Sequence, residues 1–429
     1  MISLDISGLS QIDSSHGLSL GEIESESSRI SGFLEKIHAR DQGFYQNEVL
    51  ENEELVLSIE KFAKKVKGKY DYVVVLGIGG SSLGMIALKD AFGNLFLGTH
   101  PQIYILDNID PVFISECEEV LNLQKTLFLV ITKSGGTPET LSQYFYFLKK
   151  VEEKKLVLKE HFVFITDPKK GLLREEVEKK GIPSFPVPEN VGGRFSVLTA
   201  VGLVPAALID VNIQNLLNGA KAMREKFLSQ NISENLPFQI ATIQYLLSKK
   251  GKNITVMMPY AQKLFRFADW YRQLLAESIG KEKNENGEKV HTGLTPVNAL
   301  GVTDQHSQAQ LYMEGPNDKF ILFLEVEKFE KDIEIPLPKE FHDSVHFLEN
   351  TSFAKLMRVE KKATADALTE YGKPNITVHI PEISEEHLGE LFLLFEGAIA
   401  FLGEYFGINA FDQPGVELSK NLTKKYLLE

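Results

Sequence analysis

The stretch Tyr72-Val-Val-Val-Leu76, followed at once by Gly77-Ile-Gly-Gly-Ser-Ser-Leu-Gly84, decides the fold. An unbroken apolar run predicts a strand that is buried on both faces. The glycines after it predict a tight turn into a helix, where backbone N–H groups can approach an anion closely. A second apolar run, 127–131, leads in the same way into Thr132-Lys-Ser-Gly-Gly-Thr-Pro-Glu-Thr140. Two such loops, both rich in hydroxyl groups, indicate that they share one small phosphorylated ligand.

The rest of the chain repeats the alternation of short apolar runs and helical patterns. This alternation predicts an α/β fold with two doubly wound parallel-sheet domains and flanking helices. We expect an N-terminal domain 1–210 that carries both loops after a helical lead-in (1–45), a second domain 211–404, and a C-terminal segment 405–429. The expected strands are 72–76, 102–106, 127–131, 162–166, 253–258, 319–326 and 376–380, and the clearest helices are 236–249, 262–278 and 385–405. Residues 282–290 are expected to form an exposed loop.

Composition narrows the classes of partner. The chain has 429 residues and a net charge of -13, which argues against nucleic acid or an anionic membrane surface as the main partner. Cys117 is the single cysteine, so neither an intrachain disulfide nor a cysteine metal cluster is expected. We find no secretory signal pattern and no apolar stretch suited to cross a bilayer, so we expect a cytoplasmic protein.

The sequence also argues against a redox cofactor or a metal. The loop at 77–84 nearly fits the dinucleotide pattern G-x-G-x-x-G, but Ser82 replaces the third glycine. Asp107 lies too far along the chain to be the acidic residue of that pattern. No pair of histidines stands at metal-ligand spacing near suitable carboxylates. We therefore expect no cofactor, although a plain structural turn remains an alternative for the loop.

Arg194 stands in Gly192-Gly-Arg-Phe-Ser196, directly before an apolar helical pattern. Two glycines let the backbone bend sharply and aim the guanidinium, which could hold negative charge that develops on a substrate oxygen. A structural ion pair at the start of a helix is an equally good explanation of this segment alone.

Gln273 and Glu277 lie four residues apart on the helix predicted for 262–278, so they share one face. Gly280 is expected to end this helix. A glutamate in the last turn sits at the negative end of the helix dipole, which favours its protonated form and suits a general base. For an isolated helix, an ordinary solvated glutamate would be the simpler interpretation.

Two further segments carry groups suited to proton transfer. His306 lies in Thr303-Asp-Gln-His-Ser-Gln308, where a surface or capping histidine is the simpler interpretation. Phe411-Asp-Gln-Pro-Gly-Val-Glu-Leu-Ser-Lys420 places an aromatic ring, Gln413 and Lys420 near the end of the chain. These groups could complete a sugar pocket, or the segment could be a helix that docks onto its domain.

Taken together, these segments resemble the phosphoglucose isomerase family in its bacterial short form. Six motifs occur in the order of that family: GIGGSSLG, TKSGGTPET, GGRFS, AESIGK, TDQHSQ and FDQPGVELSK. The match runs from about residue 70 to the C-terminus. Ser82, Ile279 and Pro414 stand where Asp, Asn and Trp are common, and none of these departures removes a group that the chemistry needs.

The resemblance implies two sugar isomerase (SIS) domains of flavodoxin-like topology and a reversible interconversion of glucose 6-phosphate and fructose 6-phosphate through a cis-enediol. Glu277 would be the base, Arg194 would stabilise the enediolate, and His306 and Lys420 would assist ring opening. It also implies a homodimer in which His306 serves the neighbouring subunit. The substrate-binding residues implied are Gly79, Gly80, Ser81, Thr132, Lys133, Ser134, Thr137, Gln273 and Gln413.

Two alternatives remain open. The chain could also accept mannose 6-phosphate, since the configuration at C2 is tested by the shape of the pocket. A sugar-phosphate sensor built on SIS domains would keep the phosphate loops without needing Glu277, His306 and Lys420. Such sensors usually carry a basic DNA-binding domain, and the first 45 residues are too short and too weakly basic for one.

Overall fold

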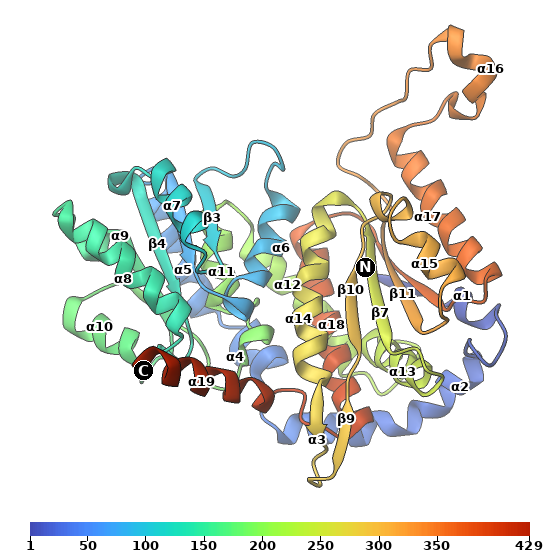
Figure 1. The fold of residues 1–429 in the computed structure, drawn as a ribbon, viewed down its shortest axis with the longest axis horizontal. Coiled ribbons are helices and arrows are strands. Elements are labelled where there is room, and N and C mark those ends of the chain that lie inside the picture. The colour runs from blue at the N-terminus through green and yellow to red at the C-terminus, as the bar shows by residue number, and fades with distance from the viewer. The chain divides into compact units, whose positions relative to one another are not determined.

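The computed structural model describes residues 1–429, with the side chain of His342 excepted. The chain forms two compact units, which we call unit 1 (Met1–Lys36 and Glu225–Glu429) and unit 2 (Ile37–Arg224). Each unit is built around one five-stranded sheet (Figure 1).

Unit 2 has an entirely parallel sheet in the order β3-β2-β4-β5-β6. Numbered within the unit, this order is 2-1-3-4-5, the flavodoxin-like topology, in which the direction of winding reverses between β2 and β4. Ligands of such sheets bind beyond the carboxyl ends of the strands at that point. The strands are β2 (Tyr72–Leu76), β3 (Gln102–Leu106), β4 (Thr126–Ile131), β5 (Phe162–Thr166) and β6 (Ser184–Pro186).

Helices cover both faces of this sheet, so its central strands are apolar on both sides. Phe128 and Val130 of β4 face one layer, formed by α7 (Pro111–Val120), α8 (Pro138–Glu153) and α10 (Leu172–Lys180). Leu127, one residue earlier in the same strand, faces the opposite layer, as expected from the two-residue period of a strand. That layer contains α5 (Glu53–Val66), α6 (Leu83–Phe92) and α11 (Ala200–Leu208).

Unit 1 repeats the same order with one change. Its sheet is β10-β7-β11-β12-β1, and its four strands from the second half of the chain are parallel in the relative order 2-1-3-4. The fifth position is taken by β1 from the N-terminus, which pairs antiparallel with β12. The strands are β7 (Ile254–Tyr260), β10 (Thr295–Asn298), β11 (Lys319–Val326), β12 (Asn375–Ile380) and β1 (Ser3–Asp5).

The core of unit 1 is organised around α18 (Glu385–Phe406). Ser384 caps its first turn by accepting a hydrogen bond from the backbone N–H of His387, and Gly407 ends it in the left-handed conformation with φ 63°. From Leu388 to Tyr405 every residue of α18 is buried, and α13 (Leu236–Lys249) and α14 (Phe265–Ile279) pack beside it. On the other face of the sheet, α15 (Ala309–Glu314) and α17 (Phe353–Glu370) contribute to the core.

The remaining elements are short or connect the units. They are α1 (Ser7–Ser10), α2 (Leu20–Glu24), α3 (Ile30–Ala39), α4 (Asn47–Leu50), α9 (Leu158–His161), α12 (Ile213–Phe227), α16 (His342–Val345), α19 (Glu417–Leu428) and the hairpin β8 (Lys281–Lys283) with β9 (Lys289–Thr292). Among the described helices, none is both long enough and apolar enough to cross a membrane.

The predicted α/β class with two doubly wound parallel sheets is confirmed. The compact units differ from the expected domains because β1 completes the sheet of unit 1, so the first 36 residues belong there and are more than a helical lead-in. The division between the units falls at Arg224 and Glu225, within α12, whereas the expected boundary was residue 210. The segment 282–290 was expected to be a loop and instead contributes to the hairpin β8–β9.

Candidate active site

The two glycine-rich loops lie together at the carboxyl edge of the unit 2 sheet. They follow β2 and β4, which are paired with Leu76 opposite Val130. Because β3 lies on the other side of β2, these strand ends form the topological switch point, where sheets of this kind bind their ligands. The sequence therefore placed both loops where an α/β sheet binds its ligand.

Three hydroxyl groups gather in the loop after β4. The Oγ1 atoms of Thr132 and Thr137 are 2.8 Å apart, and Ser134 Oγ lies 3.4 Å from each of them. Thr137 occupies the N-cap position of α8, but its side chain accepts no hydrogen bond from the first turn of that helix. The cluster thus sets its hydroxyl groups beside the positive end of a sixteen-residue helix, which is a favourable arrangement for an anion.

The loop after β2 requires glycine for two different reasons. Gly79 has a φ of 61°, a conformation that L side chains rarely adopt. A Cβ atom on Gly80 would lie 2.2 Å from the carbonyl carbon and oxygen of Gly193 and 2.6 Å from the backbone nitrogen of Arg194. Because those atoms are backbone, they cannot move aside as a flexible side chain can. Gly80 therefore sets the contact between the 3-10 turn Gly79–Ser81, which includes Ser81, and the segment that carries Arg194.

Arg194 is buried, with 4% of its surface exposed, in the 3-10 turn Gly193–Phe195. A buried guanidinium keeps its charge and presents up to five N–H donors in a planar fork. Since Gly80 touches the backbone of this turn, the structure brings Arg194 to the predicted phosphate loops of unit 2.

Lys133 is engaged with backbone carbonyl groups. Its Nζ donates to the carbonyl oxygen of Glu189 at 2.7 Å and to that of Val191 at 2.9 Å. Burial lowers the pKa of the Lys133 ammonium, although the carboxylates of Asp167 and Glu189 oppose this shift. Lys133 thus ties the loop after β4 to the residues that precede Arg194, in addition to bringing positive charge.

Glu277 and Gln273 meet on the face of α14 that their spacing predicted. Gln273 Nε2 donates to Glu277 Oε2 at 3.0 Å, and both side chains are half-buried. Lys281, itself buried, donates to the carbonyl oxygens of Glu277 at 2.8 Å and Ser278 at 2.9 Å. These bonds satisfy the end of the helix and fix the position from which the carboxylate projects.

His306 lies in a turn at the carboxyl edge of the unit 1 sheet. Asp304 organises this turn by accepting from the backbone N–H of Leu300 at 2.7 Å and from the hydroxyl of Ser307. Burial tends to raise the pKa of Asp304, but hydrogen bonds from Ser307, Gln308 and Leu300 outweigh it and hold the pKa below its usual value. The neighbouring Gln305 accepts from the hydroxyl of Tyr260, the last residue of β7, at 2.6 Å. The imidazole itself is exposed.

Glu277 and His306 of one chain lie at opposite edges of the same sheet. The helix α14 starts after the carboxyl end of β7 and runs back for 15 residues, which is about 22 Å at 1.5 Å per residue. Its end lies by the amino end of β10, since a Cβ on Gly293 would be 3.6 Å from the Cα of Gly280. His306 follows the carboxyl end of β10. The two groups of one chain are therefore too far apart to act on one substrate bond.

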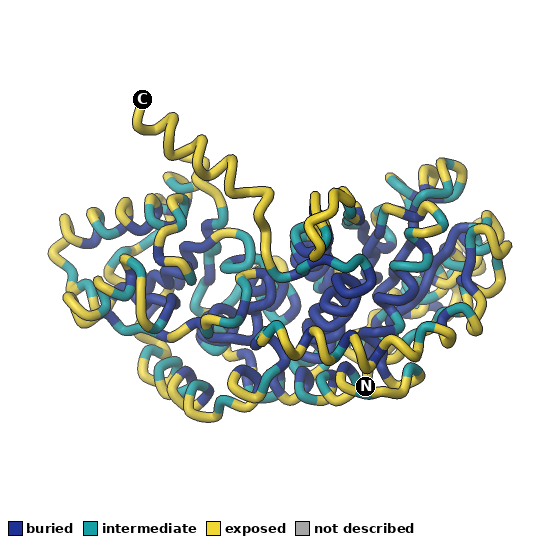
Figure 2. The backbone as a smooth tube through the Cα atoms, turned by 90° about the horizontal axis from the view of Figure 1, so that it is seen from below, coloured by how far each residue is buried: buried dark blue, intermediate teal, exposed yellow. Residues whose placement is uncertain are grey.

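The C-terminal segment begins next to Glu277. Lys281 Nζ lies 3.8 Å from Oδ1 of Asp412, the residue before Gln413. Lys420 lies further along, on α19, where its Nζ is 2.7 Å from Oε1 of Glu417. No residue of α19 is buried, and Figure 2 shows this helix exposed along its length.

The structure thus gathers the predicted phosphate loops with Arg194 in unit 2, and Gln273 with Glu277 in unit 1. It does not bring His306 or Lys420 of the same chain to Glu277. The sequence analysis did not single out Asp304 or Lys281. An aspartate two residues before the histidine in a polar turn was the available signal for Asp304. Among the described side chains, no group of three or more His, Cys, Asp or Glu residues is placed to hold a metal ion.

Comparison with known proteins agrees with this arrangement. The family described as phosphoglucose isomerase matches residues 54–429. A glucose-6-phosphate isomerase of Carboxydothermus hydrogenoformans is 47% identical over 413 residues, which cover 94% of this chain and 88% of the relative. A glucose-6-phosphate isomerase of Methanocaldococcus jannaschii is 37% identical and covers 96% of this chain and 97% of its own length.

Solved structures show the same fold. A hypothetical protein of Thermus thermophilus superposes with a TM-score of 0.91 at 33% identity, covering 100% of both chains. A glucose-6-phosphate isomerase of Chlamydia trachomatis superposes with a TM-score of 0.79 at 25% identity, covering 87% of this chain and 73% of the other. On the family match and these relatives together, the chain belongs to the phosphoglucose isomerase family.

Proposed function

We propose that this protein interconverts D-glucose 6-phosphate and D-fructose 6-phosphate, a step of glycolysis and gluconeogenesis, in the cytoplasm. The observation that carries the proposal is the pairing of Gln273 with Glu277 at the end of α14, in a chain whose other unit holds the two phosphate loops. The names of the relatives at 47% and 37% identity support the same reaction.

The phosphate is held by the loops of unit 2. The hydroxyl groups of Thr132, Ser134 and Thr137 and the backbone of Gly79–Ser81 supply neutral donors, and the N-terminus of α8 adds partial positive charge. Lys133 adds a full charge while it holds the segment before Arg194. Such a set binds an anion without a large basic patch, in keeping with the net charge of -13.

The isomerisation itself needs one base that acts on two adjacent carbons. His306 and Lys420 transfer the protons that open the sugar ring, and Gln273 and Gln413 contact the sugar. Glu277 takes the proton from C2 of the aldose, which leaves a cis-enediolate. The hydroxyl proton on O2 passes to O1, and the protonated carboxyl returns its proton to C1. Arg194 stabilises the negative charge on the enediolate oxygens, which is largest in the transition state.

A coupled assay of fructose 6-phosphate conversion tests this reaction. Glu277→Gln keeps the shape of the side chain and removes the base, so we expect kcat to fall by about 10²–10⁴-fold. Glu282→Gln is the matched control, because Glu282 lies on the nearby hairpin and pairs with Lys289, 3.1 Å away. Near-normal kcat in Glu277→Gln would refute the assignment of the base.

We also propose that the active form is a homodimer in which His306 is supplied by the second copy. The support is geometric: Glu277 and His306 of one chain lie at opposite edges of the unit 1 sheet, whereas proton transfer needs groups within about 3 Å of the reacting atoms. A second copy can bring its own exposed His306 to this Glu277. His306 is held for that task by the Asp304 turn.

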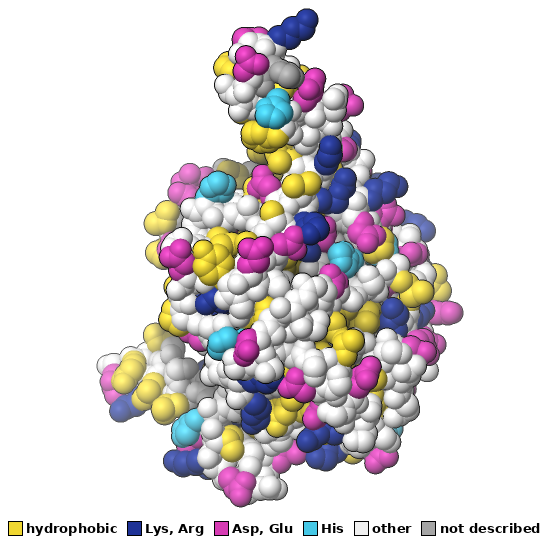
Figure 3. All heavy atoms as spheres, turned by 90° about the vertical axis from the view of Figure 1, so that its right-hand side faces the viewer, with side chains coloured by type: hydrophobic (Ala, Val, Ile, Leu, Met, Phe, Trp, Pro, Cys, Tyr) yellow, Lys and Arg dark blue, Asp and Glu magenta, His cyan; other side chains and the backbone are white. Residues whose placement is uncertain are grey.

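Unit 1 also carries a projecting arm with exposed apolar side chains, which supports association with a second copy. The arm (residues 327–352) joins β11 to α17 and extends well beyond the sheet (Figure 1; Figure 3). It exposes Ile333, Phe341 and Phe347 to 64%, 55% and 68%. Large apolar side chains on a projection are costly in a monomer, and they are typical of surfaces that become covered on association.

Mixing two inactive variants tests the shared site. A heterodimer of Glu277→Gln and His306→Ala has two active sites if each site combines Glu277 of one copy with His306 of the other. One of these sites receives both native residues, and the other receives both substitutions. We expect the mixture to recover about a quarter of wild-type activity, since about half of randomly mixed dimers are heterodimers and each has one good site of two. If both residues act within one chain, the mixture stays as inactive as its components.

A further inference from the structure

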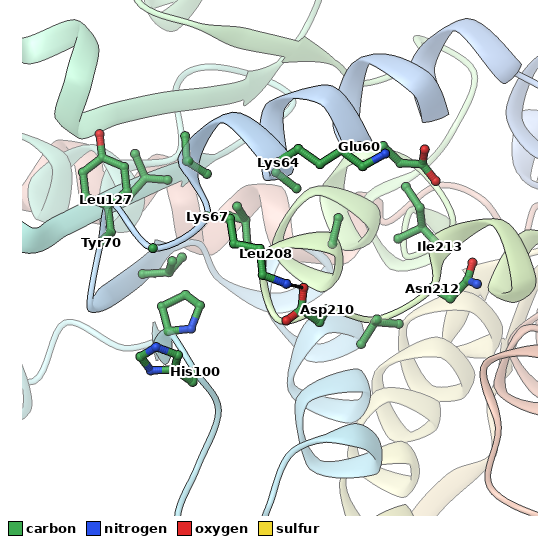
Figure 4. Close-up of a pocket in the computed structure, with 17 residues that line it drawn as sticks. Glu60, Lys64, Lys67, Tyr70, His100, Leu127, Leu208, Asp210, Asn212 and Ile213 are labelled. Atoms are coloured by element: carbon green, nitrogen blue, oxygen red, sulfur yellow. Dashed lines mark hydrogen bonds and ion pairs between the residues drawn. The ribbon is translucent and has the colours of Figure 1, made fainter.

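Unit 2 contains a cavity of about 410 Å³ at the amino edge of its sheet, away from the phosphate loops. It lies where β2 and β4 begin, at Val73 and Leu127, between the end of α5 and the chain that links α11 to α12. Figure 4 shows side chains from these elements converging on it. Among the described residues, none of the predicted substrate-binding or catalytic residues lines it.

The interior of the cavity is apolar. Val73, Leu127 and Leu208 are almost fully buried, at 1%, 2% and 7% exposure, and they form its walls with Tyr70 and Val66. A volume of this size with apolar walls and a few polar groups at the mouth is typical of small-molecule sites. An apolar body about the size of a phenyl ring with a short chain fits such a space.

The polar part of the lining carries two acidic and two basic side chains, Glu60, Asp210, Lys64 and Lys67, together with His100. Lys67 and Asp210 point toward each other (Figure 4), with Lys67 Nζ 2.6 Å from Asp210 Oδ1, and both side chains are largely exposed. Asp210 adopts a φ of 63°, a left-handed conformation that places it on a turn directly before α12. An exposed ion pair contributes little to stability, so a ligand that offers its own charges can replace it at small cost.

We propose that this cavity binds a small zwitterion with an apolar side chain, such as a free apolar α-amino acid. Its carboxylate would pair with Lys67 and its ammonium with Asp210, while its side chain enters between Val73, Leu127 and Leu208.

The cavity is independent of the phosphate loops in unit 2. Each of β2 and β4 runs from the cavity to one of those loops, and the five residues of β2 span about 17 Å at 3.3 Å per residue. A ligand in the cavity therefore cannot touch a phosphate held at the other edge. Binding at the cavity is therefore expected whether or not the protein has the proposed isomerase activity.

Titration calorimetry of the full chain with L-phenylalanine tests the proposal. We expect saturable binding to one site per chain, at least tenfold tighter than binding of 3-phenylpropionate, which lacks the ammonium group, or of 2-phenylethylamine, which lacks the carboxylate. Adding fructose 6-phosphate should leave this affinity unchanged. No saturable binding of L-phenylalanine, or equal binding of the three compounds, would overturn the proposal.

Charge variants on the exposed mouth separate the two contacts without disturbing the core. Asp210→Asn should weaken L-phenylalanine binding about tenfold and leave 3-phenylpropionate unaffected, and Lys67→Met should weaken both compounds. Lys65→Met is the control, because Lys65 lies on the same helical turn but does not line the cavity. Ala207→Phe, which fills the cavity, should abolish binding. Unchanged affinity in Asp210→Asn and Lys67→Met would place the ligand elsewhere.

Discussion

The sheets of the two units share one strand order and carry different groups at their edges. Both run 2-1-3-4 with a fifth strand at the same end, yet the fifth strand is the parallel β6 in unit 2 and the antiparallel β1 in unit 1. In unit 2 the switch point is flanked by glycine- and hydroxyl-rich loops. In unit 1 the loop after β7 is Ala261 and the 3-10 turn Gln262–Leu264, which contain no glycine.

The difference shows that the strand order determines where the loops lie, whereas the local sequence determines which chemical groups the loops carry. In the proposed function, unit 2 binds an anion at the carboxyl edge of its sheet, where glycine permits close backbone approach. Unit 1 keeps the topology, but Glu277, the base in the proposed reaction, lies at the far end of α14, beside the amino edge of the sheet. One fold thus serves phosphate anchoring in one unit and proton transfer in the other, in the function that we propose.

Gly80→Ala is expected to have the largest effect, and it tests whether the glycines of unit 2 are needed for the close approach of the two turns. The added Cβ would overlap the backbone of Gly193, so one of the two turns must shift by about 1 Å, and misplacement of that size can lower activity about 100-fold. We expect kcat/KM to fall by that order in the isomerase assay.

Gly193→Ala is the matched control for this change. It lies on the other side of the same contact, but its added Cβ would have no heavy atom within 4 Å. We expect it to retain nearly full activity. Equal losses in both variants would mean that the close approach at Gly80 does not explain the effect.

A smaller effect is expected when one hydroxyl of the phosphate cradle is removed. Thr132→Val keeps the shape of the side chain, and loss of one hydrogen bond to a charged group should raise KM about tenfold or more with little change in kcat. Thr126→Val, at the other end of β4, loses a 2.7 Å bond to the carbonyl oxygen of Asn122 and should leave KM unchanged. An unchanged KM in Thr132→Val would remove Thr132 from the phosphate site.

The core of unit 1 gives a prediction on stability. Glu396, in the middle of α18, is 0% exposed, and neither carboxyl oxygen has a hydrogen-bond partner among the described residues. Burial raises its pKa well above 4.5, so the folded state keeps a proton that the unfolded state releases. Folding stability should therefore fall as pH rises above about 4.5, by about 1.4 kcal/mol per pH unit until the folded pKa is reached.

Glu396→Gln should remove this loss, because an amide stays neutral. We expect the variant to match the wild type near pH 4.5 and to unfold at a higher temperature at pH 8, as measured by calorimetry. Glu386→Gln, at the exposed start of the same helix, should not show this gain. A wild-type-like dependence of Tm on pH in Glu396→Gln would show that Glu396 is ionised in the fold.

Much of the fold could be predicted because the central strands are continuous apolar runs. The strand β11 was predicted at its observed bounds, whereas β1 and β10 are too short and polar for periodicity to reveal them. The strand predicted at 253–258 extends past Pro259, which lies within β7 (Ile254–Tyr260). Proline has no backbone N–H to donate to a neighbouring strand. Pro259 is tolerated because β10 ends at Asn298, opposite Met257, so no residue of β10 lies opposite Pro259 to accept a hydrogen bond.

The sequence could predict contacts within the candidate site only between residues that are close together in the chain. Spacing within one helix predicted the contact of Gln273 with Glu277, which the structure shows at 3.0 Å. Contacts between distant segments, such as Gly80 with Gly193 and Lys133 with Val191, follow from tertiary structure alone. For the same reason the sequence could not show that His306 lies at the opposite edge of the sheet from Glu277.

The division of labour between the units is tested most directly by measuring kcat and fructose 6-phosphate affinity side by side in Glu277→Gln and Thr132→Val. We predict that Glu277→Gln loses turnover by at least 100-fold while its dissociation constant stays within about threefold of the wild type. We predict the reverse for Thr132→Val, with weakened binding and near-normal kcat. If both variants lose binding and turnover in the same proportion, that result would contradict the claim that unit 2 anchors the phosphate while unit 1 transfers the proton.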